Sequence, residues 1–80
     1  MNEELEELKE LQNKLQKEAN QLVNKILNLE DILYSRKRVE KITNTQISLL
    51  DIQLMSMKTY YSVLRARIED FENEIRKLEK

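Results

Sequence analysis

The apolar residues of this 80-residue chain recur with a seven-residue period from its first residue to its last. Two columns of positions, separated alternately by four and three residues, carry most of them. One column consists of Met1, Leu8, Leu15, Leu22, Leu29, Arg36, Thr43, Leu50, Met57, Leu64, Phe71 and Leu78. The other consists of Leu5, Gln12, Ala19, Ile26, Leu33, Glu40, Ile47, Leu54, Tyr61, Ile68 and Ile75. On an α-helix these columns form one stripe, which packs against another helix in a coiled coil or a bundle.

The composition favours an all-α fold. Charged residues make up 36% of the chain and aromatic residues 5%, and the sequence contains neither Gly nor Pro. These two residues are the strongest markers of turns and loops, so long uninterrupted helices are expected. A chain this short buries little surface on its own, and we therefore expect its stability to depend on self-association or on a partner.

The middle of the chain interrupts the apolar stripe. Arg36, Glu40 and Thr43 occupy three consecutive positions of the two columns. Burying such side chains unpaired would cost several kcal/mol. The segment that follows, Thr43 to Gln46, matches the capping box that begins many helices. These features predict a turn.

A turn at this place predicts an antiparallel helical hairpin, a coiled coil formed within one chain. We expect a single helical domain, residues 1–80, with a helix over 2–41, a turn over 42–45 and a second helix over 46–79. The predicted facing pairs are Leu5 with Leu78, Leu8 with Ile75, Gln12 with Phe71, Leu15 with Ile68, Ala19 with Leu64, Leu22 with Tyr61, Ile26 with Met57, Leu29 with Leu54, and Leu33 with Leu50. Small residues thereby face large ones, as layers of a packed interior require.

The alternative is a single continuous helix of about 120 Å that pairs with another chain in a coiled-coil oligomer. The constant heptad phase supports it, because a loop between two helices has no reason to preserve the seven-residue count.

Apolar residues also occupy positions outside the two columns in the middle of the chain. They are Val23, Leu27, Ile32, Tyr34, Val39, Ile42, Leu49, Ile52, Met55, Tyr60 and Val63. A contact between two helices buries only a narrow stripe, so this wider arc predicts further helices and favours a four-helix bundle made of two hairpins, a homodimer. The predicted oligomer or partner interface comprises Leu22, Ile26, Leu29, Leu33, Ile47, Leu50, Leu54, Met55, Met57, Tyr60, Tyr61 and Leu64.

Catalysis is not expected. The sequence has no His and no Cys, and therefore no imidazole base, no thiolate nucleophile and no imidazole or thiolate metal ligand. Carboxylates cluster near both ends, but they fall mostly on outward positions beside basic residues, as in Glu72 with Arg76. Such pairs are typical of solvated helix faces. We expect no catalytic residue, no metal site and no cofactor.

A basic cluster, Arg36, Lys37, Arg38 and Lys41, is the most distinctive polar feature. At the tip of a hairpin these cations could contact nucleic-acid phosphates, which would make the chain a small nucleic-acid-binding or regulatory accessory protein. The alternative is that they complement the dipole at the carboxyl end of the first helix. The chain as a whole is slightly acidic, with a net charge of -1 and a pI near 5.5, which favours the second interpretation.

The main expectation is thus a non-enzymatic helical module that self-associates and binds a protein partner through coiled-coil packing. No apolar run approaches the roughly 20 residues that span a bilayer, and the first ten residues are acidic where a signal peptide would be basic. We therefore expect a cytoplasmic protein without a membrane span.

Overall fold

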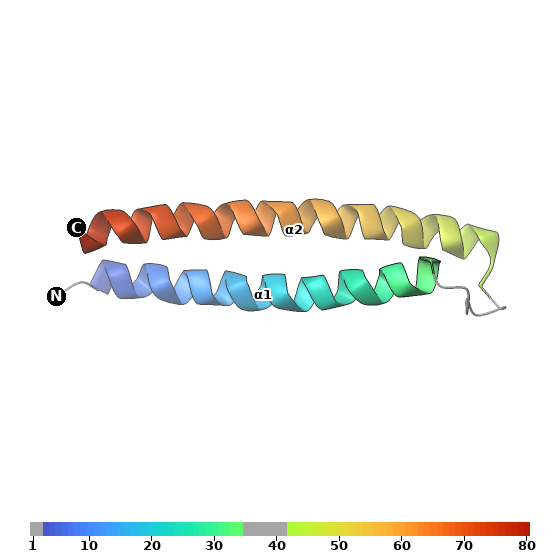
Figure 1. Ribbon diagram of the computed structural model, residues 1–80, viewed down its shortest axis with the longest axis horizontal. Helices are drawn as coiled ribbons and strands as arrows, with labels where there is room; N and C mark the ends of the chain where they lie inside the picture. Colours follow the sequence, from blue (N-terminus) through green and yellow to red (C-terminus); the bar gives the residue numbers. More distant parts are fainter. Residues whose placement is uncertain (1–2, 35–41) are drawn as a thin grey trace.

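Two long helices lie side by side in an antiparallel hairpin (Figure 1). The computed structural model describes residues 3–34 and 42–80. Helix α1 spans Glu3–Tyr34, helix α2 spans Asn44–Glu79, and the molecule measures 59 × 15 × 15 Å. The start of α1 and the end of α2 lie at the same end of the molecule. The predicted hairpin is confirmed, and the alternative of one continuous helix is wrong.

Helix α1 begins with three acidic residues, Glu3, Glu4 and Glu6, in its first turn. Their negative charges lie beside the unpaired amide groups of the helix amino end, where they are stabilising. The described part of α1 ends at Tyr34, and the end predicted at residue 41 falls outside the described residues.

Helix α2 begins at Asn44, two residues earlier than predicted, because Thr43 is its N-cap. The backbone N–H of Gln46 donates to the Thr43 hydroxyl oxygen at 3.1 Å, and the N–H of Ile47 donates to the Thr43 carbonyl at 3.0 Å. Once Thr43 satisfies these amide groups, Asn44 and Thr45 can form the first turn of the helix. The sequence offered Thr43 as one of three possible capping residues, and the turn predicted over 42–45 extended two residues too far at its carboxyl end.

The core follows the two heptad columns. One buried cluster, nearest the turn, contains Ile26, Leu29, Leu33 and Leu54, with Leu22, Ile47, Leu50, Met57 and Tyr61 partly buried around it. A second contains Ala19, Leu64 and Ile68, with Leu15, Leu22 and Tyr61 packed against it. Each predicted facing pair between Leu15 and Leu33 has both members in the same cluster. The side chains of Leu54 and Leu64 are fully buried.

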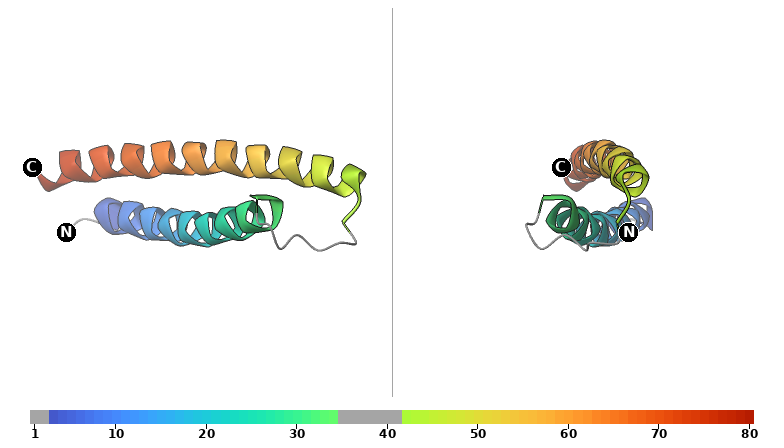
Figure 2. Two further views of the ribbon diagram at one scale, coloured as in Figure 1. Left: turned by 45° about the vertical axis from the view of Figure 1, so that its right-hand side comes forward. Right: turned by 90° about the vertical axis from the view of Figure 1, so that its right-hand side faces the viewer.

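Polar contacts between the helices flank this core. Lys58 of α2 pairs with Glu30 of α1 at 3.1 Å, and Lys9 lies 3.9 Å from Glu79 near the two termini. Both pairs are partly exposed, and exposed ion pairs contribute little to stability. The apolar clusters therefore hold the hairpin together. In the views of Figure 2 the two helices form one layer each, which leaves the outer side of both helices uncovered.

Neither helix, over the residues that the structure describes, is long and apolar enough to cross a bilayer.

Candidate interaction surfaces

The predicted interface residues fall into two groups in the structure. The larger group packs inside the hairpin, where the side chains are buried or half-buried: Leu22, Ile26, Leu29, Leu33, Ile47, Leu50, Leu54, Met57, Tyr61 and Leu64. The smaller group consists of Met55 and Tyr60, which are 65% and 42% exposed. The hairpin itself thus uses most of the predicted set, and these two side chains are available to another molecule.

The structure leaves further large hydrophobic side chains in solvent. The exposed ones are Leu11, Leu27, Ile32, Tyr34, Leu49, Ile52, Met55, Tyr60 and Val63. All but Leu11 lie between Leu27 and Val63, on the half of the hairpin nearer the turn, and all of those eight belong to the arc that lies outside the heptad columns. Within that arc, Val23 and Ile42 are half-buried, and Val39 lies outside the described residues.

The outer side of α2 forms a continuous uncharged face. We define this uncharged face by ten exposed residues on the three heptad positions farthest from α1: Thr45, Ser48, Leu49, Ile52, Met55, Ser56, Thr59, Ser62, Val63 and Ala66. It extends over about 33 Å of helix. Charge returns directly beyond it, at Glu69 and Asp70.

The outer side of α1 has the opposite character. Its outermost column carries Glu3, Glu10, Lys17, Asn24 and Asp31, all exposed and all but Asn24 charged. An ordinary surface helix places such residues toward water. The uncharged face of α2 is therefore not a general property of the chain.

Three hydroxyl groups of the uncharged face already have hydrogen-bond partners within α2. Ser56 donates to the carbonyl of Ile52 at 3.0 Å. In the same way Thr59 donates to Met55 at 3.0 Å, and Ser62 donates to Lys58 at 3.2 Å. Burying a hydroxyl is unfavourable chiefly when it loses its hydrogen bond. These side chains can therefore be covered by another apolar surface at little cost.

The charged residues near the uncharged face share one border. Between Asn44 and Ala66 the only charged residues are Asp51, Lys58 and Arg65, spaced seven apart. This spacing places them in one column, on the side where Lys58 pairs with Glu30 of α1. The opposite border carries Tyr60. Tyr60 donates a hydrogen bond to the carboxylate of Glu18, and this bond raises the pKa of the phenol above its usual 10.0. Partial removal from water and the negative charge of Glu18 raise this pKa further, whereas the positive charge of Arg67 lowers it.

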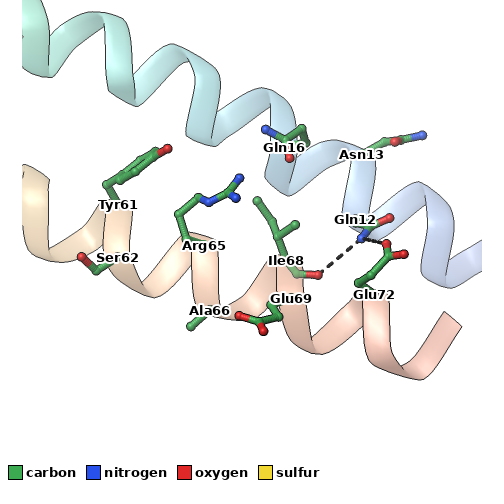
Figure 3. A pocket seen from close by; sticks show the side chains of 10 residues that line it. All are labelled: Gln12, Asn13, Gln16, Tyr61, Ser62, Arg65, Ala66, Ile68, Glu69 and Glu72. Carbon is green, nitrogen blue, oxygen red and sulfur yellow. Dashed lines mark hydrogen bonds between the residues drawn. The ribbon is translucent and has the colours of Figure 1, made fainter. Parts of the chain in front are cut away.

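A polar groove runs between the two helices toward the termini (Figure 3). It is lined by Gln12, Asn13 and Gln16 from α1, and by Tyr61, Ser62, Arg65, Ala66, Ile68, Glu69 and Glu72 from α2. The Gln12 amide donates to the Glu72 carboxylate at 2.8 Å and, more weakly, to the Ile68 carbonyl at 3.4 Å. Gln12 thereby satisfies its polar group although it occupies a core column.

The groove offers hydrogen-bond donors and acceptors rather than reactive groups. Its amides, its guanidinium and its carboxylates can bind a polar group, but none of these side chains is an ordinary general base at neutral pH. Across residues 3–34 and 42–80, no three acidic side chains come together as a metal site. Glu72 also pairs with Arg76 at 3.5 Å, as the sequence predicted.

Sequence reasoning missed both the groove and the uncharged face. It placed Gln12 in a core column and treated Glu72 as part of a solvated helix face. The sequence signal for the groove was that Gln16, Arg65 and Glu72 all occupy the heptad position next to the apolar stripe. For the face, the signal was the absence of charge from the outer positions of residues 45–66.

The predicted anion-binding residues Arg36, Lys37, Arg38 and Lys41 all lie outside the residues that the structure describes.

Comparison with known proteins identifies one family. Residues 9–70, most of both helices together with their connection, match the family model described as Sequestin. No curated protein and no solved structure gives a significant match. Because the matched region covers well over half of its length, the chain belongs to the Sequestin family.

Proposed function

We propose that this protein is a non-enzymatic helical interaction module that self-associates and binds a protein partner through the apolar surface left outside its hairpin. The observation that carries the proposal is the cluster of eight exposed large hydrophobic side chains between Leu27 and Val63. Four of them, Ile52, Met55, Tyr60 and Val63, line one shallow and mostly apolar hollow on α2. Contiguous exposed apolar patches mark interaction sites.

The energetics require several of these side chains to act together. Burying the exposed half of one Leu, Ile or Met side chain stabilises a complex by about 1 kcal/mol. Association itself costs roughly 4–15 kcal/mol in lost translational and rotational freedom. One or two contacts would therefore not suffice, whereas several such side chains from each of two copies together offset this cost. A homodimer of hairpins, packed as a four-helix bundle, is the simplest assembly that uses them.

The absence of His and Cys from the sequence supports a binding role rather than catalysis. The polar groove supports the same conclusion, since its side chains are suited to recognition by hydrogen bonds.

Sedimentation equilibrium of the full chain at micromolar concentrations tests self-association. We expect a mass twice that of the 9.7 kDa chain, in a concentration-dependent equilibrium with the monomer. A helical, cooperatively folded monomer over the whole concentration range would overturn self-association.

A further inference from the structure

We propose that the uncharged face of α2 is the dimer interface, and that it packs antiparallel against the same face of a second copy of this chain. This inference rests on the proposed function, and it specifies which surface self-associates and in which orientation. The eight exposed apolar residues are distributed over both helices, but α2 presents the longer charge-free surface, from Thr45 to Ala66, whereas the outer positions of α1 carry charge at Lys17 and Asp31.

The first argument is that this surface requires an uncharged counterpart. A charged helix surface laid on it would lose hydration without gaining an opposite charge, at a cost of several kcal/mol per buried ion. The outer face of α1 carries Glu10, Lys17 and Asp31 and is thus unsuited to this role. The uncharged face of a second copy meets the requirement.

The second argument is the fit between large and small residues. An antiparallel pair that places Ile52 opposite Thr59 of the second copy fixes every other facing pair. Leu49 then faces Ser62, Met55 faces Ser56, Val63 faces Ser48, and Ala66 faces Thr45. At each of these levels a large side chain of one copy is matched by a small one of the other, and two-fold symmetry repeats every pair. Alternating large and small residues allows two helices to interdigitate closely.

The third argument is that burial leaves three of the five hydroxyl groups of this face, those of Ser56, Thr59 and Ser62, satisfied. Ser56, Thr59 and Ser62 donate to carbonyls of their own helix, so covering them creates no unpaired hydroxyl donor. The border charges also fit. In an antiparallel pair related by a two-fold axis, each border of the face lies beside the same border of the second copy, so Asp51 of one copy lies beside Lys58 of the other.

The test is Thr59→Glu, which places a carboxylate at the centre of the proposed interface. Its matched control is Asn24→Glu, which adds the same residue at an exposed, outermost position of α1 with Asn20 and Asn28 one turn away. We expect Thr59→Glu to raise the dimer dissociation constant at least about 100-fold, since an unpaired charge would be buried in each copy. We expect Asn24→Glu to leave it unchanged. Circular dichroism should show that both variants remain as helical as the original chain.

The orientation has its own test. Ile52→Arg chains should also dimerise weakly, but mixing them with Thr59→Glu chains should restore a mixed dimer. In the antiparallel pairing the introduced guanidinium of one copy faces the introduced carboxylate of the other, so the two charges compensate each other. Failure to form mixed dimers overturns the antiparallel pairing.

The outcomes separate this inference from the proposed function. If the original chain dimerises and Thr59→Glu does so equally well, another surface mediates association, and only the present inference is overturned. If the original chain is a monomer, self-association is overturned as well, and the uncharged face is left for a different protein.

Discussion

Truncating Leu64 should destabilise the hairpin more than truncating any exposed leucine. The Leu64 side chain is 0% exposed and packs against Ala19, which is 1% exposed, and Ile68. Ala19 has no side-chain length with which to fill the space left by Leu64→Ala, so a cavity should persist. Buried Leu→Ala changes cost about 2–5 kcal/mol, and we expect the upper half of that range, about 3–5 kcal/mol.

That loss is large for a protein of this size. At roughly 0.05–0.15 kcal/mol per residue, the free energy of unfolding of an 80-residue chain is about 4–12 kcal/mol. The matched control is Leu11→Ala, the same deletion at a side chain that is 46% exposed. Because Leu11 is only partly removed from water and Ala is the better helix former, this change should cost at most about 1 kcal/mol.

Urea unfolding followed by circular dichroism at one protein concentration measures both changes. A fixed concentration is needed because self-association adds to the apparent stability. We expect the midpoint of Leu64→Ala to fall well below that of Leu11→Ala with a similar slope. Equal losses in the two variants would refute the assignment of Leu64 to the core.

Three further predictions concern the turn, the border of the uncharged face and the ends of the hairpin. Thr43→Ala should lower the free energy of unfolding by about 1 kcal/mol, because the Gln46 amide loses the hydroxyl that caps it. Asn44→Ala, at an exposed position in the first turn and outside the uncharged face, is the control, and an equal loss there would contradict the capping role. The phenol of Tyr60 should titrate above 10.0 in an ultraviolet pH titration, and Glu18→Gln should lower its pKa. Since a raised pKa favours the neutral phenol in the folded state, any associated stability is present below the pKa of the unfolded chain and is lost as the pH rises through the pKa of the folded chain. A Tyr60 pKa unchanged by Glu18→Gln would contradict the contact. A Leu5→Cys/Leu78→Cys variant should form an intramolecular disulfide in dilute solution, because the heptad pairing places these two positions opposite each other near the open end of the hairpin. A non-reducing gel that shows only interchain disulfides would contradict the hairpin.

The heptad pattern was sufficient to predict the hairpin and its facing pairs from Leu15 with Ile68 to Leu33 with Leu50. The small polar residues at 43–45 were sufficient to predict a cap near the start of the second helix. These features depend on local chemistry and on one repeated spacing, which can be read directly from the sequence. The heptad pattern was not sufficient to decide whether the apolar stripe packs within one chain or against a second chain. Residues such as Leu29 and Leu54 satisfy a coiled coil equally well within one chain or between two, and the structure places both inside the hairpin. Their predicted role at an oligomer interface stays a prediction, and the exposed surface offers a better candidate.

The lateral surfaces were harder to predict for a different physical reason. Gln12 and Glu72 are 60 residues apart in sequence and meet only because the chain folds back on itself. The outer face of α2 poses another problem, since Ser, Thr and Ala there carry no strong signal singly. Only the helix geometry shows that Leu49, Ile52, Met55 and Val63 share one side with them.

The mass of a hairpin locked by a disulfide between positions 5 and 78 tests the central claim most directly. In this form, made by oxidising the Leu5→Cys/Leu78→Cys variant, α1 and α2 cannot separate to pair with the helices of another chain. If closed hairpins associate through their outer surfaces, sedimentation equilibrium should give a dimer with the same dissociation constant as the original chain. A locked hairpin that stays monomeric while the original chain dimerises would show that association requires the hairpin to open, and would contradict the account.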